Sequence, residues 1–222
     1  MGDSVEICAV LKAQCYGLGG VQAGVLMDGL GADSFAVAVL SEAMELREKI
    51  PDKEILILGY VSERGYDMAI EHGITLTMYR EDAMRKLNQR AGELGSKALV
   101  HIKINSGMNR VGFMPTQSEA DTVLRCMRLP NLQITGIFTH LATADEADKS
   151  GAHMQMRRFD AFLEMLRRRG AEIPKVHVRQ APPSAIYRNM TGTWSVPVCC
   201  SQATIHRRTS SGRAFICSPA SS

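Results

Sequence analysis

Short apolar runs alternate with longer stretches of helical period along most of the chain. Four stretches place apolar residues three or four positions apart, which predicts amphipathic helices; they are 41–50, 81–96, 117–127 and 150–170. In the last of these, Phe159, Phe162 and Leu166 share one helix face. Seven runs rich in β-branched and aliphatic residues predict strands; they are 5–11, 34–40, 54–60, 74–79, 98–104, 132–140 and 175–179.

This alternation favours an α/β fold built on a parallel sheet. Strands that are apolar throughout are typical of a sheet whose two faces are both buried. Seven strand–helix units are one short of the eight that close a (β/α)8 TIM-type barrel, so we expect an incomplete barrel of about seven units. A doubly wound open sheet is the main alternative, although no Gly-x-Gly-x-x-Gly follows the first strand.

The end of the chain departs from this pattern. From Thr191 onward there is neither a helical nor an alternating period, and the last acidic residue is Glu172. We therefore divide the chain into a barrel domain, 1–190, and an irregular tail, 191–222, which we expect to be disordered. A shift of the reading frame near Thr191 is one hypothesis for the change in composition.

The overall composition mainly excludes classes of protein. Lys and Arg number 26 and Asp and Glu 23, and the resulting charge of +3 is too mild to favour nucleic acid or an anionic membrane. No apolar run approaches the ~20 residues of a membrane span, and the first residues do not form a secretion signal. The six cysteines show no Cys-x-x-Cys spacing, which favours reduced thiols in a cytoplasmic protein.

The end of the first predicted strand carries a candidate reactive group. Active sites of parallel barrels lie where the strands end and the loops begin, and Lys12 directly follows the first apolar run. One interpretation is a strand-end lysine whose amine reaches solvent, and spacing alone favours it. The other is a lysine that forms a Schiff base with a carbonyl compound.

Two further strand ends carry candidate chemistry. Lys103 lies at the end of the fifth run, and Arg110 follows in a loop, where its planar guanidinium suits a carboxylate or a phosphate. His140 ends the sixth run, although a lone histidine there is more often structural. Acidic residues follow His140, but no second histidine stands at ligand spacing, so we expect no metal site.

Three separated segments resemble one known family. The segment 10–19, Val-Leu-Lys-Ala-Gln-Cys-Tyr-Gly-Leu-Gly, resembles the signature of alanine racemases, which are pyridoxal 5′-phosphate (PLP) enzymes of fold type III. The segments 103–113 and 136–145 agree with that family in order and spacing. The resemblance runs from about residue 5 to about residue 186, and it implies the N-terminal PLP-binding barrel of these enzymes.

The resemblance implies five contacts to PLP, which would be the cofactor. Lys12 would hold PLP through a Schiff base. Tyr16 and Ser184 would bind the cofactor phosphate. Leu58 and His140 would pack against the pyridine ring, and His140 would also count among the catalytic residues.

The resemblance also implies the reaction, which interconverts L-alanine and D-alanine and supplies D-alanine for peptidoglycan. Lys12 would act as one catalytic base, and Arg110 would bind near the ring oxygen and the substrate carboxylate. Lys103 matches a position that is often carbamylated and would support Arg110. Racemisation needs a second base on the opposite face, which in this family is a tyrosine from the C-terminal β domain of the partner subunit in a homodimer.

The sequence departs from the family at several points. Gln14, Leu18 and Pro183 stand where the family usually has Asp, His and Asn. We recognise no C-terminal β domain and no eighth strand, so we expect free edges on the first and seventh strands, doubtful dimerisation and turnover near background. Three interpretations stay open: an alanine (or serine) racemase, a single-domain PLP-binding barrel without turnover, and the inactive product of a damaged gene.

Overall fold

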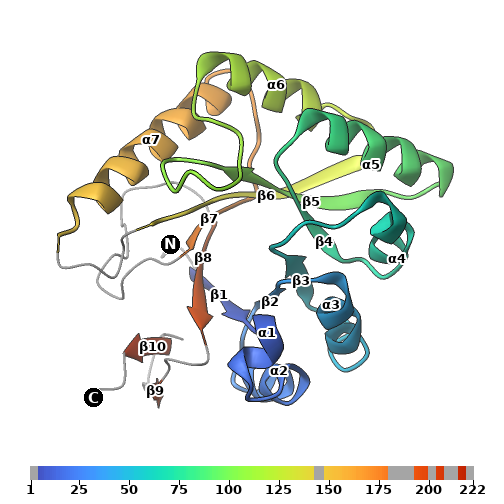
Figure 1. Ribbon diagram of the computed structural model, residues 1–222, viewed down its shortest axis with the longest axis vertical. Helices are drawn as coiled ribbons and strands as arrows, with labels where there is room; N and C mark the ends of the chain where they lie inside the picture. The colour runs from blue at the N-terminus through green and yellow to red at the C-terminus, as the bar shows by residue number, and fades with distance from the viewer. Residues whose placement is uncertain (1–4, 143–147, 180–192, 200–203, 208–214, 219–222) are drawn as a thin grey trace.

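Eight parallel strands form a closed barrel in the computed structural model, which describes residues 5–142, 148–179, 193–199, 204–207 and 215–218. Each strand pairs with the next one along the chain, and the eighth pairs with the first (Figure 1). The strands are β1 (Val5–Val10), β2 (Ser34–Val37), β3 (Glu54–Ile57), β4 (Thr75–Met78), β5 (Ala98–Ile104), β6 (Leu132–His140), β7 (Lys175–Arg179) and β8 (Thr193–Cys199).

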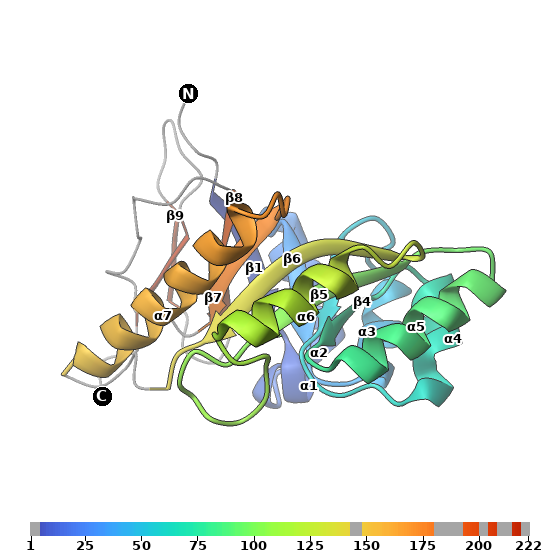
Figure 2. The same ribbon diagram turned by 90° about the horizontal axis from the view of Figure 1, so that it is seen from above.

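Helices cover the outer side of this ring. Seen from above, α5, α6 and α7 follow one another along the outside of β5–β7 (Figure 2). The helical elements are α1 (Lys12–Tyr16), α2 (Gly20–Gly29), α3 (Leu40–Arg47), the 3-10 turn η1 (Glu63–Gly65), α4 (Tyr66–Glu71), α5 (Glu81–Glu93), α6 (Gln117–Met127) and α7 (Ser150–Arg167). Among the described residues, no helix has both the length and the apolarity to cross a membrane.

The predicted α/β barrel class and the seven predicted strands are confirmed. Four helices, α3, α5, α6 and α7, lie where the helical period predicted them. The spacing of apolar residues did not predict α2, because this helix contacts α3 at a glycine and has no continuous apolar face. A Cβ atom on Gly24 would lie 2.4 Å from Leu46, while Val25 and Leu26 on the same helix are exposed.

The structure differs from the sequence-based expectation at the eighth strand. The segment 193–199 was expected to be irregular, yet it pairs in parallel with β1 from Val5 to Val10 and with β7 from Lys175 to His177. The edges of β1 and β7 are therefore not free. An unpaired edge offers a row of backbone donors and acceptors, and any extended segment within reach can satisfy them whatever its side-chain period. β9 (Thr204–Arg207) and β10 (Phe215–Ser218) form a separate antiparallel pair.

Alternate residues along each strand face two different regions of the core. One side of the strands packs against the helices in the main apolar core, which includes Phe35, Ile57, Val100 and Phe159. The opposite side lines the inside of the ring, where Cys8, Val10, Ala36 and Leu56 form a smaller apolar cluster. Because side chains alternate between faces along a strand, the sequence of each strand sets both regions at once.

The remaining inward positions form a buried polar network. Glu54 Oε1 lies 3.0 Å from His101 Nε2, and Glu54 Oε2 lies 3.0 Å from Lys175 Nζ. Lys175 also pairs with Glu6 at 2.8 Å, and His101 Nδ1 lies 2.9 Å from Nε2 of His177. Two carboxylates therefore face one ammonium and a histidine pair inside the amino half of the barrel.

The charges of this network hold one another in the ionised form. Burial alone would raise the pKa of Glu54, but His101 and Lys175 hold it well below its ordinary value of 4.5. Burial alone would lower the pKa of Lys175, but Glu6 and Glu54 raise it above its ordinary value of 10.5. Glu54 and Lys175 therefore both stay charged at neutral pH.

We predict that Glu54→Gln lowers the free energy of unfolding by about 2–4 kcal/mol at pH 7, because Lys175 and His101 lose a buried counter-charge. The pKa of Glu54 is depressed in the fold, so its contribution is present above pH 4.5 and is lost as the pH falls below that value. Urea unfolding at neutral and acidic pH measures both effects.

The matched control is Glu63→Gln. Glu63 pairs with Lys86 on the surface, where both side chains are more than half exposed, so we expect a change within ~0.5 kcal/mol. Equal losses of unfolding free energy in the two variants would show that Glu54 contributes no more to stability than a surface ion pair does.

Candidate active site

Four candidate residues lie at one end of the barrel. In a parallel barrel the carboxyl ends of all strands open at the same mouth. Lys12 follows β1, Leu58 follows β3, and His140 is the last residue of β6. Lys103 lies one residue before the end of β5. Ser184 lies outside the residues that the structure describes.

A left-handed turn after β1 brings Lys12 and Tyr16 together. The φ angles of Ala13, Gln14, Cys15 and Tyr16 are 54°, 53°, 51° and 55°. The turn places Lys12 Nζ 5.6 Å from the centre of the Tyr16 ring, within the range of a cation–π contact. The amine and the phenol therefore lie close to each other at the mouth.

An apolar surface lines the inner side of β1–β3. Leu58 packs against the small cluster inside the ring, formed by Cys8, Val10, Ala36 and Leu56. Gly59 follows, and a Cβ atom there would lie 2.3 Å from the carbonyl oxygen of Ala38, so only glycine lets the chain leave β3 so close to the end of β2. This side of the mouth suits the face of a flat ring.

Lys103 occupies an enclosed position on the other side of the ring. Its side chain is buried, and its Nζ lies 5.7 Å from the centre of the Phe138 ring. Phe138 stacks on His177 with ring centres 4.6 Å apart. An ammonium buried beside an aromatic ring is unusual, because burial penalises its charge.

The loop after β5 folds back onto its own strand. Lys103 O accepts a hydrogen bond from the backbone N–H of Phe113, and Phe113 O accepts one from Asn105. The Asn105 side chain accepts from the N–H of Asn109, which has a φ of 55°. At Gly112, with φ 139°, a Cβ atom would lie 2.4 Å from the Asn105 nitrogen. This loop therefore tolerates glycine alone at position 112.

Arg110 lies on this loop, but no hydrogen bond or ion pair among the described residues links its side chain to the other candidate residues. Its side chain is exposed. None of the residues in 5–142 or 148–179 forms a hydrogen bond or an ion pair with its guanidinium. Its predicted role near a ring oxygen and a carboxylate remains a prediction.

Buried hydrogen bonds connect the loops after β5 and β6. Ser106 Oγ lies 2.8 Å from Thr139 Oγ1, next to His140 in sequence. Gln155 of α7 is buried and accepts a hydrogen bond from the N–H of Ala142, and it also packs against Gly107. These contacts set where β6 ends and therefore where His140 lies.

Sequence reasoning missed several residues that shape this region. His101, His177 and Glu54 were not singled out, although His101 interrupts the apolar residues of β5 and His177 lies between two valines of β7. That interruption, repeated at alternate positions in Val100-His101-Ile102-Lys103, was the available signal. Gln155 carried no comparable signal, because a polar residue on an amphipathic helix usually faces solvent.

The side chains described at the mouth suit an organic ligand. No three His, Cys, Asp or Glu side chains within the described ranges form a group that could hold a metal ion. The mouth instead combines a primary amine, a phenol, an imidazole and an apolar surface, from Lys12, Tyr16, His140 and Leu58. A primary amine in such a setting can bond covalently to an aldehyde.

Comparison with protein families finds one match over most of the chain. The model described as "Alanine racemase, N-terminal domain" matches residues 1–194. The alanine racemase of Desulforamulus reducens is 41% identical over 170 residues, which are 77% of this chain and 46% of that protein. The alanine racemase of Methanococcus maripaludis is 38% identical over 172 residues, 78% of this chain and 46% of that protein. The chain thus spans about half the length of the curated relatives it matches.

Solved structures agree with this result. The alanine racemase of Clostridium difficile 630 in complex with cycloserine has a TM-score of 0.84 at 31% identity, over 95% of this chain and 57% of that one. The alanine racemase from E. faecalis has a TM-score of 0.80 at 30% identity, over 92% of this chain and 54% of that one.

We predict that Gly112→Ala destabilises the protein by at least about 2 kcal/mol, because the added methyl group meets the Asn105 backbone and the positive φ disfavours any Cβ. The urea midpoint measures the loss. Gly29→Ala is the control, since a Cβ at that helix end meets nothing within 4 Å, and we expect no loss. A Gly112→Ala protein as stable as the parent would contradict the described loop.

Proposed function

Because the chain belongs to the alanine racemase family, we propose that its barrel binds PLP at the mouth and takes part in the interconversion of L-alanine and D-alanine. Enzymes of this family depend on PLP. The observation that carries the proposal is the left-handed turn that holds the amine of Lys12 beside the phenol of Tyr16.

The residues present fit this cofactor. PLP carries an aldehyde, a flat aromatic ring and a phosphate. Lys12 offers the primary amine that an aldehyde requires, and Leu58 offers an apolar surface for the ring. The Tyr16 hydroxyl is a donor suited to phosphate, and this side chain is 46% exposed, so the group is accessible. Ser184 would be a second donor.

Within the proposal, the candidate residues have different tasks. Lys12 would be the point of covalent attachment and would take the substrate α-proton on one face. His140 would pack against the ring, and Arg110 would bind the substrate carboxylate. Lys103, buried beneath the mouth, would support Arg110, and a carbamate formed from its amine and carbon dioxide would replace the ammonium by an anion of opposite charge to the Arg110 guanidinium.

The chemical difficulty of the reaction lies in removing an unactivated α-proton. When bound, PLP withdraws electrons from the α-carbon and makes that proton removable. Racemisation then needs one base on each face of the α-carbon. Lys12 would serve one face, and a tyrosine of a partner subunit in a homodimer would serve the other.

The closed ring supports a second candidate function, a PLP-binding barrel without turnover. A barrel that binds a ligand on its own needs all its strands paired, and residues 5–199 contain all eight strands. Both functions share the Lys12 anchor. They differ in whether the chain inverts an amino acid, and in the racemase case alanine and serine are both candidate substrates.

We also propose a reducing, cytoplasmic location, where D-alanine would be made for the cell wall. Cys8, Cys15 and Cys126 are buried. Burial raises the pKa of the Cys126 thiol to about 11, which keeps it protonated and unreactive at neutral pH.

We predict that borohydride treatment traps PLP covalently on Lys12, because reduction makes an amine–aldehyde bond permanent. Peptide mass spectrometry locates the label. Lys12→Ala should lose the label and the visible absorbance of bound PLP. Lys97→Ala is the matched control, since this exposed lysine directly precedes β5 at the opposite end of the barrel. Equal labelling of the parent and Lys12→Ala would refute the anchor.

A second prediction separates the two candidate functions. A racemase barrel with one base should exchange the α-proton of alanine with deuterium from solvent, while inversion by the 222-residue chain alone stays near background. Mass spectrometry measures the exchange, and chiral chromatography measures the inversion. Deuterium uptake equal to that of Lys12→Ala would favour the binding barrel, and rapid inversion would contradict the need for a second base from elsewhere.

A further inference from the structure

The turn that presents Lys12 and Tyr16 has an intrinsically unfavourable backbone. Four successive residues other than glycine, 13–16, have φ between 51° and 55°. Left-handed conformation costs an L-residue roughly 1–2 kcal/mol. Such a turn persists only where surrounding contacts hold it, so the contacts that do so control where the amine and the phenol lie.

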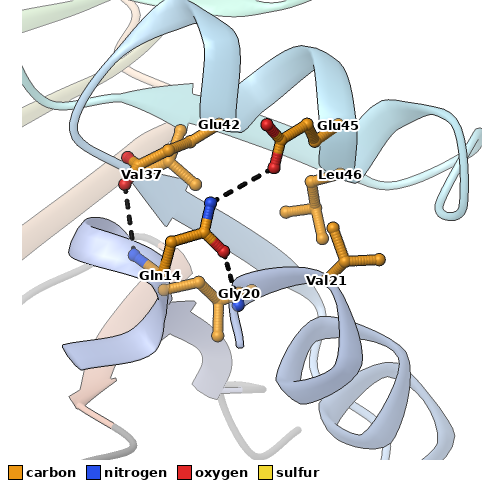
Figure 3. A pocket seen from close by; sticks show the side chains of 8 residues that line it. Gln14, Gly20, Val21, Val37, Glu42, Glu45 and Leu46 are labelled. Atoms are coloured by element: carbon orange, nitrogen blue, oxygen red, sulfur yellow. Dashed lines mark hydrogen bonds between the residues drawn. The ribbon is translucent and has the colours of Figure 1, made fainter. Parts of the chain in front are cut away.

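Gln14 makes most of these contacts (Figure 3). Its side-chain Oε1 accepts a hydrogen bond from the N–H of Gly20 at 3.1 Å, and its Nε2 donates to Glu45 at 3.2 Å. Its backbone N–H donates to Glu42 at 3.3 Å, and its backbone carbonyl accepts from the N–H of Gly19 at 2.9 Å. One residue thus ties the turn to α2 on one side and to α3 on the other.

The two carboxylates that accept hydrogen bonds from Gln14, those of Glu42 and Glu45, both belong to α3. Oε2 of Glu42 accepts from the backbone N–H groups of Ala38 and Val39, at 2.8 and 3.3 Å, in the first turn of the helix. Its Oε1 is left to face Gln14. Beneath the amide, Leu11 and Leu46 belong to the buried core. The carboxylate of Glu42 is therefore held by its own helix, and it serves as a fixed reference against which the turn is placed.

The arrangement selects a neutral amide at position 14. The Gln14 side chain must donate to a carboxylate at one end and accept from a backbone N–H at the other, and an amide offers both on two separate atoms. A carboxylate at this position would accept from Gly20 but would face Glu45 with a second negative charge. The family's usual aspartate would therefore not match Glu45 in this chain.

We propose that Gln14 is a positioning residue, matched to Glu45, which locks the left-handed turn so that Lys12 and Tyr16 are presented together at the mouth. Its importance for cofactor binding rests on the proposed function. Its effect on the turn does not, because the hydrogen bonds involve protein groups alone.

The test uses the full 222-residue chain and four variants. Gln14→Glu keeps the size and the acceptor but removes the donor and adds a charge, and Gln14→Ala removes both contacts without adding charge. The double variant Gln14→Glu/Glu45→Gln restores one donor and one acceptor with their roles exchanged. Gln22→Glu is the control, because Gln22 is exposed on neighbouring α2 and its side chain makes no hydrogen bond within the described residues.

The first readout is amide hydrogen exchange at Gly19 and Gly20 without cofactor. Gln14→Ala loses both side-chain hydrogen bonds, while Gln14→Glu loses the one to Glu45 and adds charge repulsion there, so we expect a roughly tenfold faster exchange in each single variant. The double variant should return to within about threefold of the parent, and Gln22→Glu should match the parent. Rescue by exchanging the two groups is an outcome that a general loss of stability would not produce. Unchanged exchange in both single variants would overturn the proposal.

The second readout is PLP itself, trapped by borohydride at increasing concentrations. The concentration for half-maximal labelling of Lys12 should rise roughly tenfold in Gln14→Glu and recover in the double variant. A double variant no better than Gln14→Glu would refute the pairing with Glu45. If the parent chain takes up no PLP at all, the proposed function fails, while the exchange data still decide whether Gln14 locks the turn.

Discussion

Closure of the ring is the constraint on which the other features depend. Parallel strands leave every edge with unpaired backbone groups, and only pairing of β8 with both β7 and β1 satisfies them all around. Closure brings the carboxyl ends of the strands to one mouth and separates the side chains into an inner and an outer set. The outer set is apolar and packs on the helices, whereas the inner set is divided between an apolar cluster and a charged network.

This division gives the two ends of the barrel different properties. At the amino end, Glu54 and Lys175 compensate each other's charge, and Glu54 also contacts the histidine pair through His101. At the mouth, the backbone is strained instead: the turn after β1 and the loop after β5 both contain residues with positive φ. Strained backbone concentrates where reactive groups must be presented in one geometry.

The candidate site was predictable to different degrees at different residues. Lys12 and Tyr16 lie four residues apart in a segment that resembles a family signature, and they are in contact. Lys103 and His140 were predicted at the ends of strands, where they lie. Arg110 was predicted from its residue type, but an exposed loop residue has no neighbours that sequence spacing can reveal. Gln14 looked like a departure from the family, and its match to Glu45 emerged only from the packing of α3.

The sequence by itself determined the alternation of strands and helices, because side-chain period and strand length are local properties. It also determined which strand ends carry an amine or an imidazole. The tertiary structure alone decided that 193–199 would complete the ring and that Glu54 would meet Lys175, 121 residues away. Pairing of distant groups depends on the curvature of the sheet and the burial of the partner, and neither is encoded in the spacing of residues along the chain.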